Sequence, residues 1–341
     1  MRIGITLTGV AVALALVPAT GSARAEDKPA TLKLSSGLPP QHPLNPSLMA
    51  WAESLKKATG NTVTATLFPS GRLGRTSDHH DMVRDGVADF AYVEPGEQPG
   101  RFPILAGAAL PFLFADATGG TAAIDTWYRQ YAAQEMKDVK FCFAFVHHPG
   151  TLHALRKVLV PGDLKGLKVR PATRSIGQLV TALGGTNVSP SAPESRDLLA
   201  RGAVDAITSP WGAIPLLGVD EVVQYHMDAP LYVTPYAWVM NRAKYERLAP
   251  AQKRAVDDHC STEWAERVAA PWAEFESGAP ARLARHGHEV YKPSPEQLKA
   301  WREASAPVHA QWADAVRKAG EDPGKVMESL KAHLARFKAA L

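Results

Sequence analysis

The stretch Pro161-Gly-Asp-Leu-Lys-Gly-Leu-Lys-Val-Arg-Pro171 decides the fold of this chain. A turn leads into a strand predicted over 167–170, and Pro171 ends that strand because proline has no N–H for a sheet. Arg170 therefore lies at the carboxyl end of a strand, where open α/β sheets bind their ligands. A guanidinium group there can bind a carboxylate through two parallel hydrogen bonds. On the residues alone, a solvated surface arginine is the commoner interpretation.

Further strands are predicted along the chain, with helical patterns between most of them. Such alternation is typical of α/β layers with largely parallel sheets. One pattern, a helix end followed by glycine and a strand, occurs around Gly86 and again around Gly202, which suits two related lobes; two unrelated helix ends would look the same. The predicted strands are 31–34, 62–68, 90–93, 139–146, 206–209, 221–225 and 236–240.

The C-terminal third is predicted to be mostly helical. One helical pattern runs from Pro250 towards Arg285, with Pro271 and Gly278 as candidate kinks. A short strand is predicted over 287–291. Ser294-Pro-Glu-Gln297 is a capping-box start for the next helix.

The N-terminus indicates export. Arg2 precedes an apolar run over 3–17, and Ala23-Arg-Ala25 is a small-x-small cleavage site. This arrangement predicts a signal peptide over 1–25, removed before Glu26, and hence a periplasmic protein. The alternative, a membrane anchor, is disfavoured because the run is short for a bilayer.

Composition narrows the function classes. The 341 residues suggest two domains, and 45% hydrophobic content allows a large core. The net charge of +4 falls to +2 when Arg2 and Arg24 leave with the signal peptide, so no nucleic-acid partner is indicated. Phosphate-binding, serine-hydrolase and HExxH motifs do not occur, and no cofactor is expected. Cys142 and Cys260 could form a disulfide or remain buried thiols.

Two histidine groups are the candidates for metal chemistry. His79-His80-Asp81 is expected to diverge, because neighbouring residues on a helix point in different directions. His147, His148 and His153 follow a predicted strand and could line a cleft. Without cysteine or carboxylate neighbours they are a weak metal site, so no metal is predicted.

Residues 163–170 closely resemble the DLKGLKIR motif of the solute-binding subunits of tripartite ATP-independent periplasmic (TRAP) transporters, of the C4-dicarboxylate-binding-protein type. Other segments resemble the family in the same order along most of the mature chain: Pro69–Gly74, Arg84–Asp89, Leu110–Phe112, Thr181–Gly184, Gly202–Asp205, Val239–Asn241 and Tyr245–Leu248.

The resemblance implies an α/β, two-lobed periplasmic binding protein of type II-like architecture, with one long helix spanning both lobes. Lobe I would comprise 26–147 and 235–275, and lobe II 148–234 and 276–341. The lobes would close on the ligand and the closed form would dock on a membrane permease. A monomer is expected.

The resemblance also implies that Arg170 forms the salt bridge to the substrate carboxylate. Ser209 stands where many relatives have a ligand-contacting asparagine, and Trp211 belongs to a proline-tryptophan pair found in one branch of the family. In the cleft, Trp211 would favour a flat or apolar tail; otherwise it packs under a lobe. The remaining candidates for ligand contact are His42, Tyr92, His148, Arg174 and Tyr236.

The main hypothesis is therefore a TRAP-type binding protein for a small organic acid, and not an enzyme. One alternative is a periplasmic metal-dependent enzyme using His147, His148 and His153, and another is a ligand-sensing partner of a receptor.

Overall fold

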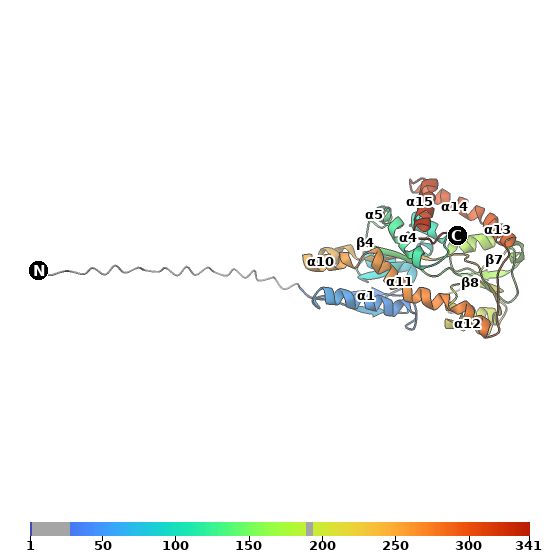
Figure 1. Ribbon diagram of the computed structural model, residues 1–341, viewed down its shortest axis with the longest axis horizontal. Coiled ribbons are helices and arrows are strands. Elements are labelled where there is room, and N and C mark those ends of the chain that lie inside the picture. Colours follow the sequence, from blue (N-terminus) through green and yellow to red (C-terminus); the bar gives the residue numbers. More distant parts are fainter. Residues whose placement is uncertain (2–27, 189–193) are drawn as a thin grey trace.

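The computed structural model describes residue 1, residues 28–188 and residues 194–341, and it contains two β-sheets with helices packed around them (Figure 1). The predicted signal peptide lies outside the described residues, apart from Met1. Among the helices of the described part, none combines the length and the apolar character needed to cross a bilayer.

The first sheet, sheet I, has the strand order β2-β1-β3-β10-β4. Its first three strands are parallel, whereas β10 is antiparallel to both neighbours. The strands are β1 (Ala30–Ser35), β2 (Val63–Phe68), β3 (Phe90–Val93), β4 (Lys140–Val146) and β10 (Pro235–Met240).

The second sheet, sheet II, has the order β11-β9-β5-β8-β6-β7, and β5 runs antiparallel to β8 and β9. The α/β class is thus confirmed, while the expectation of largely parallel sheets is only partly right. Strands β5 and β10 each follow a passage of the chain from one sheet to the other, as does β11, which is parallel to its neighbour β9. The strands are β5 (Thr151–Ala154), β6 (Lys168–Arg170), β7 (Thr186–Asn187), β8 (Ala206–Ser209), β9 (Tyr225–Met227) and β11 (Glu289–Tyr291).

The repeated glycine pattern has the same structural role in both sheets. Gly86 and Gly202 both adopt positive φ, +78° and +67°, a conformation that glycine adopts without steric cost. The carboxylate of Asp89 accepts a hydrogen bond from the N–H of Lys33 in β1, and Asp205 does the same for Lys168 in β6, each at 2.8 Å. The two units therefore join neighbouring strands in equivalent ways, as expected for related lobes.

The helices differ from prediction mainly after residue 250. The predicted long helix is three helices, interrupted at residues 259–261 and at Gly278. The longest, α11, packs against α1, α4 and β4 and continues towards α12, so it runs from one half of the molecule to the other (Figure 1). The helices are α1 (Leu44–Ala58), α2 (His79–Arg84), α3 (Pro103–Ala106), α4 (Thr118–Tyr128), α5 (Ala132–Glu135), α6 (Arg174–Ala182), α7 (Ser195–Ala200), α8 (Ala213–Leu216), α9 (Arg242–Glu246), α10 (Pro250–Asp258), α11 (Thr262–Ser277), α12 (Ala279–Arg285), α13 (Pro295–Ala304), α14 (Ala306–Lys318) and α15 (Pro323–Arg336).

A disulfide links the first interruption to sheet I. Cys142 of β4 bonds Cys260 in the turn between α10 and α11, at a sequence separation of 118. This resolves the question that the sequence left open. The bond also ties the start of α11 to the edge strand of sheet I.

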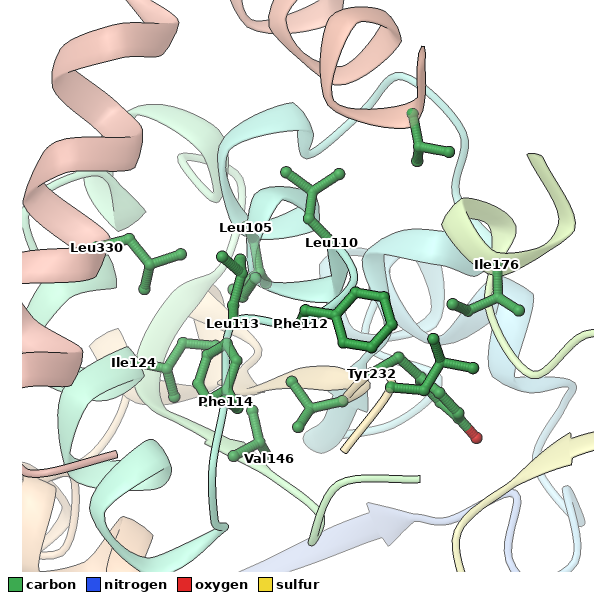
Figure 2. Close-up of a cluster of buried hydrophobic side chains, with 14 of the residues drawn as sticks. Leu105, Leu110, Phe112, Leu113, Phe114, Ile124, Val146, Ile176, Tyr232 and Leu330 are labelled. Carbon is green, nitrogen blue, oxygen red and sulfur yellow. The ribbon is translucent and has the colours of Figure 1, made fainter. Parts of the chain in front are cut away.

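A large apolar cluster contains residues of both sheets and of the helices α4, α6, α14 and α15. Figure 2 shows Leu110, Phe112 and Phe114 at its centre, with Leu330 of α15 on one side and Ile176 of α6 on the other. Phe112 has a φ of +60°, and its N–H donates to the carbonyl of Leu231 at 3.0 Å. The Leu-Pro-Phe segment thus bridges elements from both sheets.

One strand prediction is misplaced, and two strands, β5 and β7, were not predicted. Residues 219–221 form a 3-10 turn after Gly218, and the strand expected over 221–225 lies instead at Tyr225–Met227. Strand β5 was missed because four residues after a proline-glycine pair carry little periodicity. The division into lobes remains a prediction: each sheet falls within one proposed lobe, but α15, assigned to lobe II, packs against α4.

Candidate functional site

Arg170 ends β6, which lies in sheet II between β8 and the edge strand β7. The residue is half-buried, and its Nε atom is buried without a hydrogen-bond partner. Across the described residues, no carboxylate forms an ion pair with this guanidinium group, whereas Arg84, Arg101 and Arg129 each pair with an aspartate. A buried donor without a partner is costly. The group is therefore poised to bind an acceptor from outside the chain.

Glu94 and Tyr232 are the ionisable neighbours of Arg170. Burial, with a smaller contribution from the charge of Glu97, raises the pKa of Glu94 to about 8 against the opposing charge of Arg170. Burial also raises the pKa of Tyr232 well above its usual value, again opposed by Arg170. The Tyr232 hydroxyl has no well-aligned partner in the described part of the chain, although Thr208 lies near enough to lower its pKa. Figure 2 shows this hydroxyl directed away from the apolar cluster.

Sheet I contributes an aromatic wall. Tyr236 of β10 contacts Tyr92 of β3 edge-on, with ring centroids 5.4 Å apart, and lies 5.8 Å from Trp272 of α11. Trp272 in turn contacts His42 at 4.8 Å. The predicted residues His42 and Tyr236 thus contact Trp272, and Tyr92 joins them through Tyr236. The Tyr92 hydroxyl already accepts a hydrogen bond from the N–H of Gly37.

His147 and His148 lie where the chain leaves sheet I. His147 Nε2 accepts from the N–H of Thr234 at 2.9 Å, so its proton is on Nδ1, which donates to the carbonyl of His148 at 2.5 Å. Burial lowers the pKa of His147 to about 4, so the ring is neutral at pH 7. Burial also lowers the pKa of the half-buried His148.

Ser209 is the last residue of β8, and Trp211 follows it by two residues. Trp211 is 3% exposed and packs in a separate apolar cluster with Ile207 and Ile214. Its ring contacts His153 edge-on at 5.1 Å. The Ser209 carbonyl accepts from His153 Nε2. As placed here, Trp211 supports the end of β8, and its contact with a ligand remains a prediction.

A cavity of about 240 Å³ lies beside Glu94, and Arg170, Tyr232, Tyr236 and Trp272 are not among its lining residues. Its lining includes Glu94, Thr234 and Pro235, together with Thr173, the exposed Arg174 and Trp312 of α14. Its volume lies just below the roughly 300–1,000 Å³ of typical ligand pockets, which suits a small acid. We call Arg170, Glu94, Tyr232, Tyr236 and Trp272 the inter-sheet site.

Sequence reasoning missed three members of the inter-sheet site. Glu94 directly follows β3, as Arg170 ends β6, so its place at a strand's carboxyl end could have identified it. Tyr232 and Trp272 carry no comparable signal. Tyr232 comes from a loop that only the tertiary fold brings to Arg170, and Trp272 comes from a long helix that the fold packs against Tyr236.

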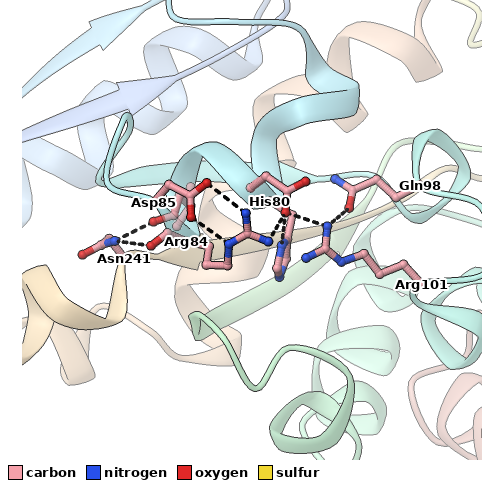
Figure 3. Close-up of polar contacts among 8 residues, drawn as sticks. His80, Arg84, Asp85, Gln98, Arg101 and Asn241 are labelled. Carbon is pink, nitrogen blue, oxygen red and sulfur yellow. Dashed lines mark hydrogen bonds and ion pairs between the residues drawn. The ribbon is translucent and has the colours of Figure 1, made fainter.

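The histidine groups do not form metal sites. In the first group, Asp81 pairs with Arg84 and Arg101, each at 2.7 Å. Figure 3 shows His80 between the side chains of Arg84 and Arg101. His79 instead bonds the carbonyl of Tyr92. Over the described ranges, no set of three histidine, cysteine or acidic side chains converges as metal ligands would.

The second group diverges in the same way. His153 bonds the ring of His226, with 2.8 Å between their Nδ1 atoms. Both nitrogens of His147 are engaged with Thr234 and His148. The three rings proposed for a metal-dependent enzyme therefore bind different partners.

The comparisons with known proteins agree with this architecture. Residues 34–315 match the family described as bacterial extracellular solute-binding protein, family 7. A TRAP periplasmic solute-binding protein from Bordetella bronchiseptica, solved with bound (R)- and (S)-mandelate, is 30% identical, covers 91% of this chain and all of its own, and has a TM-score of 0.83. A marine metagenome TRAP protein in complex with 3-hydroxybenzoate is 28% identical over 91% of this chain and 99% of its own, with a TM-score of 0.84.

Among curated proteins, the outer membrane transporter protein TsaT of Comamonas testosteroni is 23% identical over 89% of this chain and 92% of its own length. The match over residues 34–315 extends well beyond half of the chain, and the solved relatives share its two-lobed fold. The chain therefore belongs to family 7 of the bacterial extracellular solute-binding proteins, and the resemblance to TRAP solute-binding subunits is confirmed.

Proposed function

We propose that this protein captures a small organic carboxylate, most readily an aromatic monocarboxylate, at the inter-sheet site and delivers it to a TRAP membrane permease from the periplasm. The observation that carries the proposal is the buried Arg170 Nε without a partner. A ligand carboxylate would satisfy this donor and form a charge-assisted pair with the guanidinium group.

The surroundings of Arg170 favour an aromatic acid. Tyr236 and Trp272 present ring faces and edges, and aromatic ligands gain from offset or edge-on contacts with such rings. Two relatives at 28–30% identity were solved with mandelate and 3-hydroxybenzoate. Many TRAP solute-binding subunits resembled by this chain have a second arginine in the stretch that corresponds to His147–Gly150. This chain has no arginine there. A single carboxylate is therefore the expected ligand group.

A thermal-shift screen tests the ligand class. Benzoate, 3-hydroxybenzoate and mandelate should raise the melting temperature, since a ligand that binds only the folded state stabilises it. Succinate should raise it less. If succinate gave the larger shift and the aromatic acids none, the aromatic class would be rejected.

Substitution of Arg170 tests the salt bridge. Arg170→Ala should weaken binding of the best acid by about 2–5 kcal/mol, or roughly 30-fold to several thousandfold. Arg170→Lys should retain part of the affinity, because lysine supplies a point charge without the paired donors. Arg156→Ala, at an exposed arginine just after β5, is the matched control and should bind as the wild type does.

A further inference from the structure

One buried carboxyl group connects the two sides of the inter-sheet site. Glu276 lies in the last turn of α11 and is 1% exposed. Its Oε1 accepts a hydrogen bond from Trp272 Nε1 at 2.9 Å, and its Oε2 accepts one from the N–H of Gly212. Trp272 belongs to the apolar cluster beside sheet I, whereas Gly212 directly follows Trp211 in the cluster beside sheet II. The Glu276 side chain therefore forms hydrogen bonds to residues of both apolar clusters.

The backbone at Gly212 is built for this contact. A Cβ atom added at Gly212 would lie 2.3 Å from the ring of Phe275, so only glycine allows the loop to approach α11 this closely. The loop comes directly after β8, the strand that pairs with β6 and Arg170. Its contact with α11 therefore fixes the part of sheet II that carries the ligand arginine.

Glu276 also lies near the ligand position. Its charge raises the pKa of Tyr232, the tyrosine beside Arg170. Burial raises the pKa of Glu276 itself to about 7, while the two N–H donors and Arg282 oppose that shift. Burying a carboxyl group costs stability unless its partners compensate, and an apolar residue would avoid that cost. The two hydrogen bonds of Glu276 instead join the apolar cluster beside sheet I to the cluster beside sheet II.

We propose that Glu276 is a positioning residue for ligand binding: it holds the loop after β8 against α11 and so keeps sheet II closed over sheet I. The inference rests on the proposed function, because closure matters only if a ligand is captured between the sheets. Bonds of this kind act on the closed complex, so their loss should speed ligand release and leave association almost unchanged.

Three variants separate this role from a general effect on stability. In stopped-flow binding of mandelate, Glu276→Ala should increase the dissociation rate at least about tenfold while the association rate stays within about twofold. Glu276→Gln should lie between, because glutamine accepts from one N–H and turns its own donor towards the other. Glu274→Gln, an exposed neighbour on the same helix, should match the wild type. A merely structural role would lower the melting temperature and leave the dissociation rate of the folded protein unchanged; that result would overturn the proposal.

A second measurement needs no ligand. Hydrogen exchange of the peptide containing Gly212 should become faster in Glu276→Ala and stay at the wild-type rate in Glu274→Gln. Unchanged exchange in Glu276→Ala would also overturn the proposal, because the contact would then not hold the loop. If the wild type bound no organic acid, the proposed function would fail, and with it the role in ligand release; exchange at Gly212 would show whether the contact itself exists.

Discussion

Ligand binding should be linked to proton uptake by Glu94. The Glu94 carboxyl group lines the cavity and lies close enough to Arg170 to be influenced by its charge, and burial raises the pKa of Glu94 to about 8. At pH 7 about nine-tenths of the molecules would carry a neutral Glu94, so it neither repels an anion nor competes for Arg170. Above pH 8 it ionises and opposes the ligand. Affinity for a carboxylate should therefore fall as the pH rises through 8.

The size of this linkage follows from electrostatics. Two unit charges about 5 Å apart at an effective dielectric constant of about 20 repel by roughly 3 kcal/mol, which would raise the pKa of Glu94 by about two units in the complex. Binding at pH 9 would then take up about 0.8 protons, and the Kd would rise by up to about tenfold per pH unit above 8.

Calorimetry in buffers of different ionisation enthalpy measures this uptake directly. Titration of mandelate at pH 9 should give an observed enthalpy that depends on the buffer in the wild type. Glu94→Gln should remove most of that dependence and keep the affinity constant from pH 7 to 9. Equal enthalpies in all buffers for the wild type would refute the reasoning, since Glu94 would then not change its protonation on binding.

Three further predictions concern stability. Replacing Cys142 and Cys260 with serine should lower the free energy of unfolding by about 5 kcal/mol in the chain-entropy model, because the bond closes a loop of 118 residues; guanidinium unfolding measures it. His147, with its pKa lowered to about 4, should contribute about 3 kcal/mol that is fully present above pH 6.5 and lost as the pH falls towards 4; an NMR titration midpoint near 6.5 would contradict this. Trp211→Ala should cost about 3–5 kcal/mol, because the ring is buried, and a loss below 1 kcal/mol in urea unfolding would show that it is not a core residue.

The sequence predicted the local parts of this fold well. A proline-bounded strand placed Arg170 at the carboxyl end of β6, and the two glycine patterns marked equivalent turns before β3 and β8. These features depend on neighbours in the chain, which composition and spacing report directly. The capping box at Ser294 was confirmed for the same reason.

Features that depend on distant segments could not be predicted in this way. Periodicity says nothing about strand direction, so the antiparallel β5 and β10 were not anticipated. The disulfide interrupts what reads as one continuous helical pattern before α11. Trp272 and Glu276 look like ordinary helix residues, and only the packing of α11 brings Trp272 into the apolar cluster beside sheet I and Glu276 to the N–H of Gly212 after β8.

The central claim is that Arg170 receives the ligand carboxylate, and a crystal structure of the protein grown with mandelate tests it most directly. The account predicts the mandelate carboxylate within about 3 Å of the Arg170 guanidinium nitrogens, with one oxygen accepting from Nε. A mandelate bound elsewhere, with Arg170 directed to solvent or paired with Glu94, would contradict it.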